Sequence, residues 1–240
     1  GYSVTTSLAF VIEPRNSKAI AHHETERLSF SVSNYGPIGL APGSIFPTGG
    51  KGFNLDSLGD YLYEGGIMIT TGPAKIESAI RFQLPEPKMD FKVAPGGDME
   101  VTHINGAIDR VSSCIFTDEN AASPIGLKIY QKAFSFAPPY DDIAIIQYVI
   151  RNTTGSTIIN LRFGLSLDWD VYSLANNAGG WETTEQYLWT AYNSGPVGDP
   201  NLSRYRGARL VNGSVATAAT ADATTSVWLP WWIPGANGYT

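Results

Sequence analysis

The fold is decided by the stretch Asn160-Leu161-Arg162-Phe163-Gly164-Leu165-Ser166-Leu167-Asp168-Trp169-Asp170. Every second residue from Leu161 to Trp169 is large and apolar, and the residues between them are polar or glycine. Successive side chains of an extended chain point to opposite faces, so this alternation gives one apolar face for a core and one polar face for solvent. The stretch therefore predicts a long, half-buried β-strand over 160–170.

The run just before it, Asp142–Ile150, is apolar at odd and even positions alike, which predicts a central strand covered on both faces. Between the two lies Asn152-Thr153-Thr154-Gly155-Ser156, a turn sequence of suitable length to join them as a hairpin. Further strands are expected at 28–33, 61–70, 75–82, 127–136 and 186–192. Because no stretch carries a helical stripe, these strands predict an all-β, antiparallel β-sandwich, jelly-roll-like or Ig-like, with long loops.

The composition excludes several classes of protein. Of the 240 residues, 43% are hydrophobic, too many for a disordered chain, and no run approaches the ~18 apolar residues of a membrane helix. The 22 Asp and Glu against 16 Lys and Arg give a net charge of −6, which, without a Lys/Arg cluster, argues against nucleic acid as a partner. A single Cys rules out a disulfide framework and any multi-cysteine metal site.

The two ends of the chain differ from the middle. Residues 1–27 are predicted to form an extension strand, Tyr2–Ile12, and a polar linker, Glu13–Arg27, ahead of a sandwich domain over 28–240. The other end, Trp228–Pro234, is strongly apolar. Apolar ends are expected to be covered, so the candidate assembly residues are Tyr2, Val4, Leu8, Phe10, Ile12, Trp228, Trp231 and Trp232. Whether Tyr2–Ile12 pairs within its own sandwich or with a neighbouring chain stays open.

No catalytic machinery is evident in the sequence. The motifs of serine hydrolases, zinc proteases and phosphate-binding loops are absent, so we expect no enzymatic activity. The adjacent His22 and His23 would point to opposite faces of a strand and could not chelate one metal ion together, which favours a solvated linker. His103 is expected to be structural, and Cys114, in a strand-like run, to be a buried and inert thiol.

The pair Asp168 and Asp170 is the most distinctive polar feature. Two carboxylates at this spacing share one face of a strand, which suits an oxygen-liganded cation such as calcium. Four residues that follow could add ligands: Asn176, Asn177, Glu182 and Glu185. The alternatives are acids that cap a turn or pair with Arg, and a glycosidase that uses carboxylates from Asp141, Asp142, Asp168 or Asp170. Calcium is therefore a candidate ligand, and no cofactor is required.

Two features point to sugars. Asn152, Asn201 and Asn212 each begin an Asn-x-Ser/Thr triplet and are candidate sites of covalent glycosylation. A cluster of aromatic residues could form a sugar-binding platform on the sandwich, although rings at alternate strand positions more often belong to the core: Trp181, Tyr187, Trp189, Tyr192 and Tyr205.

Several segments of the chain occur in a familiar order. A Tyr140-Asp141-Asp142 turn leads into Gln147-Tyr148-Val149-Ile150-Arg151-Asn152-Thr153-Thr154-Gly155 and then into 160–170, with Tyr61–Ile69 upstream and Tyr187–Tyr192 downstream. This order resembles a recurrent β-sandwich block of large secreted and cell-surface bacterial proteins, and the resemblance covers roughly residues 28–240. It implies a β-sandwich, an extracellular or cell-surface location and a chain that is one unit of a longer exported polypeptide. It implies no catalytic residue.

Two hypotheses about function follow. In the first, the chain is a non-enzymatic structural protein, the subunit of a surface fibre or pilus-like filament that assembles head-to-tail with copies of itself by intersubunit strand complementation. In the second, it is an accessory or carbohydrate-binding module of a larger secreted protein or enzyme, with glycans as partners.

Overall fold

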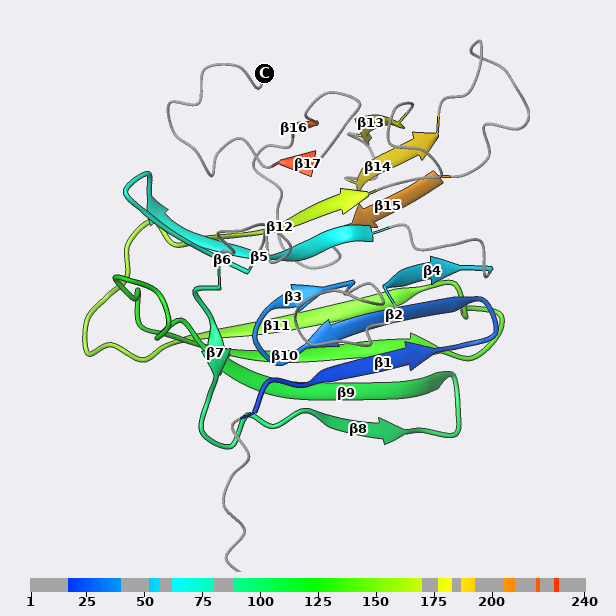
Figure 1. Cartoon of the computed structure of the whole chain (residues 1–240), viewed down its shortest axis with the longest axis horizontal. Helices are drawn as coiled ribbons and strands as arrows, with labels where there is room; N and C mark the ends of the chain where they lie inside the picture. Colours follow the sequence, from blue (N-terminus) through cyan, green and yellow to red (C-terminus); the bar gives the residue numbers. More distant parts are fainter. Residues whose placement is uncertain are drawn as a thin grey trace, which may run out of the picture.

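The computed structural model describes residues 17–39, 52–56, 62–79 and 89–169, together with the strands at 177–182, 187–192, 205–209, 219–220 and 227–228. The regular secondary structure in this part of the chain consists of β-strands alone, and every strand pair is antiparallel (Figure 1). None of these residues belongs to a helix long and apolar enough to cross a membrane. The prediction of an all-β, antiparallel architecture is confirmed.

The strands form two large sheets and one small one. The nine-stranded sheet has the order β1-β2-β3-β5-β12-β17-β16, with β4 also paired to β2 and β6 to β5. Its strands are β1 (Ile20–Glu24), β2 (Leu28–Ser33), β3 (Pro37–Ile38), β4 (Phe53–Leu55), β5 (Leu62–Gly72), β6 (Lys75–Ser78), β12 (Arg162–Trp169), β16 (Ala219–Thr220) and β17 (Val227–Trp228).

The five-stranded sheet has the order β11-β10-β9-β7, with β8 also paired to β9. Its strands are β7 (Lys92–Val93), β8 (Glu100–His103), β9 (Ile108–Thr117), β10 (Leu127–Phe136) and β11 (Ala144–Asn152). The three-stranded sheet, drawn near the top of Figure 1, consists of β13 (Asn177–Glu182), β14 (Tyr187–Tyr192) and β15 (Tyr205–Arg209).

The core lies between the two large sheets, which makes them a β-sandwich. In one cluster, Ile67 and Ile69 of β5 pack with Phe116 of β9 and Ile129 of β10, and all four are fully buried. In the other, residues of β2 and β12 pack with Ala133 of β10. Strand β10 shows how the sequence produces this arrangement, because its side chains alternate along its whole length between buried and exposed or half-buried positions.

The predicted hairpin between 142–150 and 160–170 is wrong. β11 pairs with β10, whereas β12 pairs with β5 in the other sheet, so the connecting turn crosses from one layer to the other. Both strands carry an apolar face, and they bury these faces against each other across the core: the rings of Tyr148 and Phe163 lie 5.2 Å apart. Period-two patterning gives the face of a strand but not its hydrogen-bonded neighbour.

The prediction that 142–150 is a central strand covered on both faces is also wrong. β11 is the edge strand of its sheet, and its outward residues Ile145 and Val149 are 39% and 54% exposed. The other long strand, β12, is more buried than expected. On β12, the polar face expected to meet solvent is partly covered, because Ser166 is only 4% exposed.

The polar linker predicted over 13–27 is a strand for part of its length. Residues 20–24 form β1, which pairs with β2 in the register Ile20↔Ser33 to Glu24↔Ser29. His23 is consequently fully buried and not solvated. The reason is local: its ring stacks on Phe30 at 4.5 Å, and both ring nitrogens lie within hydrogen-bond distance of serine hydroxyls from the opposite sheet. The extension strand Tyr2–Ile12 lies outside the described residues.

Candidate functional site

The candidate site is the lateral edge of the sandwich at which β11 and β12 face each other. Within the described part of the chain, β11 pairs with β10 on one side and with no strand on the other. β12 pairs with β5 along its length, but with β17 only at Leu167. We call this side of the sandwich the open edge.

Apolar side chains from both layers line the open edge. Ile146, Tyr148 and Ile150 of β11 and Phe163 and Leu165 of β12 pack against the core clusters but are only partly buried. Ile129, one strand further in, is fully buried. The hydrophobic core is thus closed in the middle of the sandwich and incompletely covered at this side.

One polar atom at the open edge lacks a partner. The Tyr148 hydroxyl is buried and has no hydrogen-bond partner among the described residues. Burial raises the pKa of Tyr148, so the phenol stays neutral and retains its proton as a donor. Buried donors in folded proteins are normally satisfied, and the neighbour that also raises the pKa of this phenol is Cys114 of β9, two strands further into the sheet.

Strand β11 also lacks the features that usually protect an exposed edge. Charged residues, prolines and bulges keep most edge strands from pairing with other chains. From Ala144 to Ile150 the strand has no charged residue and no proline, and its pairing with β10 shows no register shift. By contrast β1, the first strand of the larger sheet, carries His22, His23 and Glu24.

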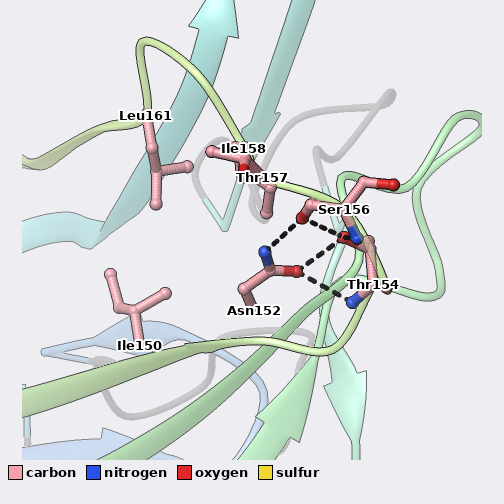
Figure 2. A pocket seen from close by; sticks show the side chains of 8 residues that line it. Ile150, Asn152, Thr154, Ser156, Thr157, Ile158 and Leu161 are labelled. Carbon is pink, nitrogen blue, oxygen red and sulfur yellow. Dashed lines mark hydrogen bonds between the residues drawn. The ribbon is translucent and has the colours of Figure 1, made fainter.

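A surface pocket of about 460 Å³ lies at the far end of β11 (Figure 2). Ile150 and Leu161 lie on one side, and Asn152, Thr154 and Ser156 form a hydrogen-bonded polar group on the other. No residue that lines this pocket is charged. The pocket therefore continues the mixed apolar and neutral character of the open edge and contains no evident catalytic group.

Of the predicted glycosylation sites, only Asn152 is described. It is exposed, and its side-chain oxygen accepts hydrogen bonds from the backbone N–H of Thr154 at 2.8 Å and from the Thr154 hydroxyl at 2.7 Å. Its amide donates to the Ser156 carbonyl at 2.7 Å. Asn201 and Asn212 lie outside the described residues. Glycosylation stays a prediction at all three.

The acidic residues predicted as metal or catalytic groups are divided among different elements. Asp168 is half-buried on β12, in register with Glu64, whereas Asp170 and Asn176 lie outside the described residues. Asp142 is ion-paired with Arg27 at 2.9 Å. The described residues contain no group of three or more His, Cys, Asp or Glu side chains that could hold a metal ion. Calcium stays a prediction.

The aromatic cluster divides between two faces of the small sheet. The register pairs Trp189 with Gly180 and Gly207, Tyr187 with Arg209, and Tyr205 with Ala191, so Tyr187, Trp189 and Tyr205 share one face. Trp181 pairs with Leu188 and belongs to the opposite face, as does Tyr192. The sugar-binding platform stays a prediction.

The remaining predicted residues are placed as follows. Cys114 is 4% exposed on β9, and burial raises its pKa to about 12, as expected of an inert thiol. His103 is exposed on β8. Trp228 belongs to β17 and pairs with Ala219, whereas Trp231 and Trp232 lie outside the described residues.

Sequence reasoning missed a buried acidic pair that connects the two sheets. Glu77 of β6 accepts a hydrogen bond from the N–H of Ile125, and Asp118, just after β9, accepts from Gly126 and Leu127. Both carboxyl side chains belong to buried residues. Burial, together with the Asp118 charge, raises the pKa of Glu77 to about 8. No sequence signal identifies this pair, because its members lie in separate segments.

Comparison of the chain with protein-family models, with curated proteins and with solved structures finds no match. The functional argument therefore depends on the geometry of the molecule itself.

Proposed function

We propose that the chain is a non-enzymatic structural protein of the cell exterior, the subunit of a fibre that grows by β-strand complementation between copies. The observation that carries this proposal is the open edge, where β11 has no described partner on the side away from β10 and apolar side chains of both layers are incompletely covered. A strand added there would satisfy the backbone of β11 and cover the core at the same time.

The same chain carries a suitable strand. Tyr2, Val4, Leu8, Phe10 and Ile12 all occupy even-numbered positions, so an extended Tyr2–Ile12 segment has one bulky apolar face. That face suits the incompletely covered apolar side chains of β11 and β12 at the open edge, while main-chain groups of the segment pair with β11. If each subunit donates its strand to the next, the contact is head-to-tail and does not close, which yields a filament. The exterior location is supported by the resemblance of the 140–170 region to exported proteins.

Deletion of residues 1–14 tests the assembly. We expect the full chain to form filaments visible by negative-stain electron microscopy, and the truncated chain to be a folded monomer. A synthetic peptide of residues 1–14 should bind the truncated chain and slow amide hydrogen exchange along 144–152. A matched peptide with Leu8→Asp and Phe10→Asp should not bind. Filaments that form equally well without residues 1–14 would refute the proposal, and protection at β1 instead of β11 would refute the choice of edge.

The second candidate function is that of a carbohydrate-binding module. It is favoured by the position of Trp189 in the three-stranded sheet, where glycine stands beside it on both neighbouring strands, with Tyr187 and Tyr205 on the same face. Glycines beside an aromatic residue leave its ring uncovered for stacking. Glycan-array binding that is lost in Trp189→Ala and kept in Trp181→Ala, on the opposite face, would support this function over a purely structural one.

A further inference from the structure

The outward face of β10 and β11 combines cationic and apolar side chains. On β10 the outward residues are Lys128, Tyr130, Lys132 and Phe134, and on β11 they are Ile145, Gln147, Val149 and Arg151. The register arranges them in rows that alternate in character: Lys128 beside Arg151, Tyr130 beside Val149, Lys132 beside Gln147, and Phe134 beside Ile145. We call this surface the basic face.

The cations of the basic face are not neutralised. Lys128, Lys132 and Arg151 make no ion pair with any carboxylate among the described residues, whereas Arg27 and Lys92 do. Neither β10 nor β11 contains an acidic residue, in a chain whose net charge is −6. Lys128 and Arg151 stand directly opposite each other in the register, and like charges in that position destabilise a sheet. The Lys128 ammonium lies over the ring of Tyr130, 5.7 Å from its centroid, and an anion bound beside it would be attracted by Arg151 as well.

The apolar rows are accessible on the same face. Val149 is 54% exposed and Ile145 39% exposed, and the rings of Tyr130 and Phe134 are half-buried beside them. The row of Lys132 and Gln147 separates these two apolar rows, so each offers a small apolar surface next to a cation. A ligand of the basic face should therefore present apolar surface as well as negative charge.

The requirements for negative charge and for apolar surface limit which polymers could bind to the basic face. A second copy that used the same face about a two-fold axis would bring Lys128 and Arg151 against their own equivalents. A nucleic acid is bound mainly through its phosphates by clusters of Lys and Arg, and three cations are few for that. In a carboxylated sugar chain each unit combines a carboxylate with a ring whose faces present C–H groups, so one unit can meet a cation and a neighbouring apolar side chain together. We propose that the basic face binds an acidic polysaccharide, independently of the fibre assembly proposed above.

Calorimetric titration of the full chain with polygalacturonate oligomers tests this site. We expect binding that weakens as salt is raised, because the charges are exposed, and no binding of neutral galactose oligomers of the same length. The double variant Lys128→Gln, Arg151→Gln should lose about tenfold or more in affinity. The control Lys75→Gln changes a half-buried lysine of the other sheet, whose ammonium donates to the Pro124 carbonyl, and should bind as the unchanged protein does.

Several outcomes would overturn the proposal. These are absence of binding, equal binding of the neutral oligomers, tighter binding of a single-stranded oligonucleotide of the same charge, and equal loss in the Lys75→Gln control. Filament formation by the double variant, followed without polysaccharide, separates this proposal from the previous one. A defect there would identify the basic face as a contact between subunits, and normal filaments that lose polysaccharide binding would support the site.

Discussion

At the scale of single residues, the sandwich depends on two buried titratable groups that connect its layers. His23 of β1 lies between the hydroxyls of Ser112 and Ser135, which belong to the opposite sheet. Glu77 of β6 and Asp118 bind three consecutive backbone N–H groups that precede and begin β10. Burial favours the neutral form of both His23 and Glu77, but because one is a base and the other an acid, the two predict opposite dependences of stability on pH.

His23 should make the fold sensitive to acid. Burial, with Arg110 and His22 nearby, lowers the pKa of His23 from 6.5 to about 4, so the folded chain keeps it neutral while the unfolded chain takes up a proton. Its contribution to stability is complete above pH 6.5 and is lost as the pH falls toward 4, a loss of up to about 3 kcal/mol. In His23→Gln, urea midpoints should vary less over this interval. The exposed-site control His103→Gln should keep the original slope, and an unchanged slope in His23→Gln would contradict the prediction.

Glu77 should give stability the opposite dependence on pH. Its pKa is raised from 4.5 to about 8, so the folded chain holds a proton that the unfolded chain releases, and stability is lost as the pH rises from 4.5 to 8. Glu77→Gln removes this cost and should be more stable than the unchanged protein at pH 8, by on the order of 3 kcal/mol, and similar to it at pH 4. The control is Glu119→Gln, an exposed acid paired with Lys92. A Glu77→Gln variant that is less stable at both pH values would show that the carboxyl is needed in ionised form.

At the scale of elements, the sequence predicted the positions of strands along the chain better than it predicted which strands pair with each other. The bounds of β2 and β10 are those expected from their alternating residues, and β12 begins two residues later than expected. The pairing of β11 and the burial of His23 could not be predicted, because both depend on which strands from distant parts of the chain become neighbours. The open edge could not be predicted either, because an apolar run without charges is compatible both with a covered strand and with an unprotected edge.

The hairpin β5–β6 depends on one glycine at a close approach of two backbones. A Cβ atom at Gly66 would lie 2.1 Å from the carbonyl oxygen of Ala79. Ala79 follows β6 directly and still pairs with β5, because its N–H donates to the carbonyl oxygen of Ile67. Gly66→Ala should therefore destabilise the fold by about 1–3 kcal/mol or more, since the backbone must move. Gly106→Ala, where a Cβ meets nothing within 4 Å, is the matched control. Thermal unfolding of both variants measures the difference, and equal melting temperatures would refute this account.

At the scale of the whole molecule, the two titrating groups together shape the stability of the sandwich. Between pH 4.5 and 6.5 the effects of His23 and Glu77 oppose each other, and from 6.5 to 8 only Glu77 acts. We therefore expect a broad stability maximum in mildly acidic solution, followed by a decline toward pH 8. The class of architecture was predictable from patterning alone, whereas the division of the strands into layers, and so the candidate site, was not.

The single cysteine offers a way to watch the sandwich open. Cys114 is the only thiol in the chain, it is 4% exposed, and its pKa of about 12 leaves almost no thiolate while the core is closed. An alkylating reagent can therefore react only with molecules whose two layers have separated, and the rate of labelling counts those molecules directly. Because no other sulfhydryl competes, the native protein is its own probe of layer separation. If a donated strand closes the sandwich, chains within filaments should be labelled more slowly than free subunits.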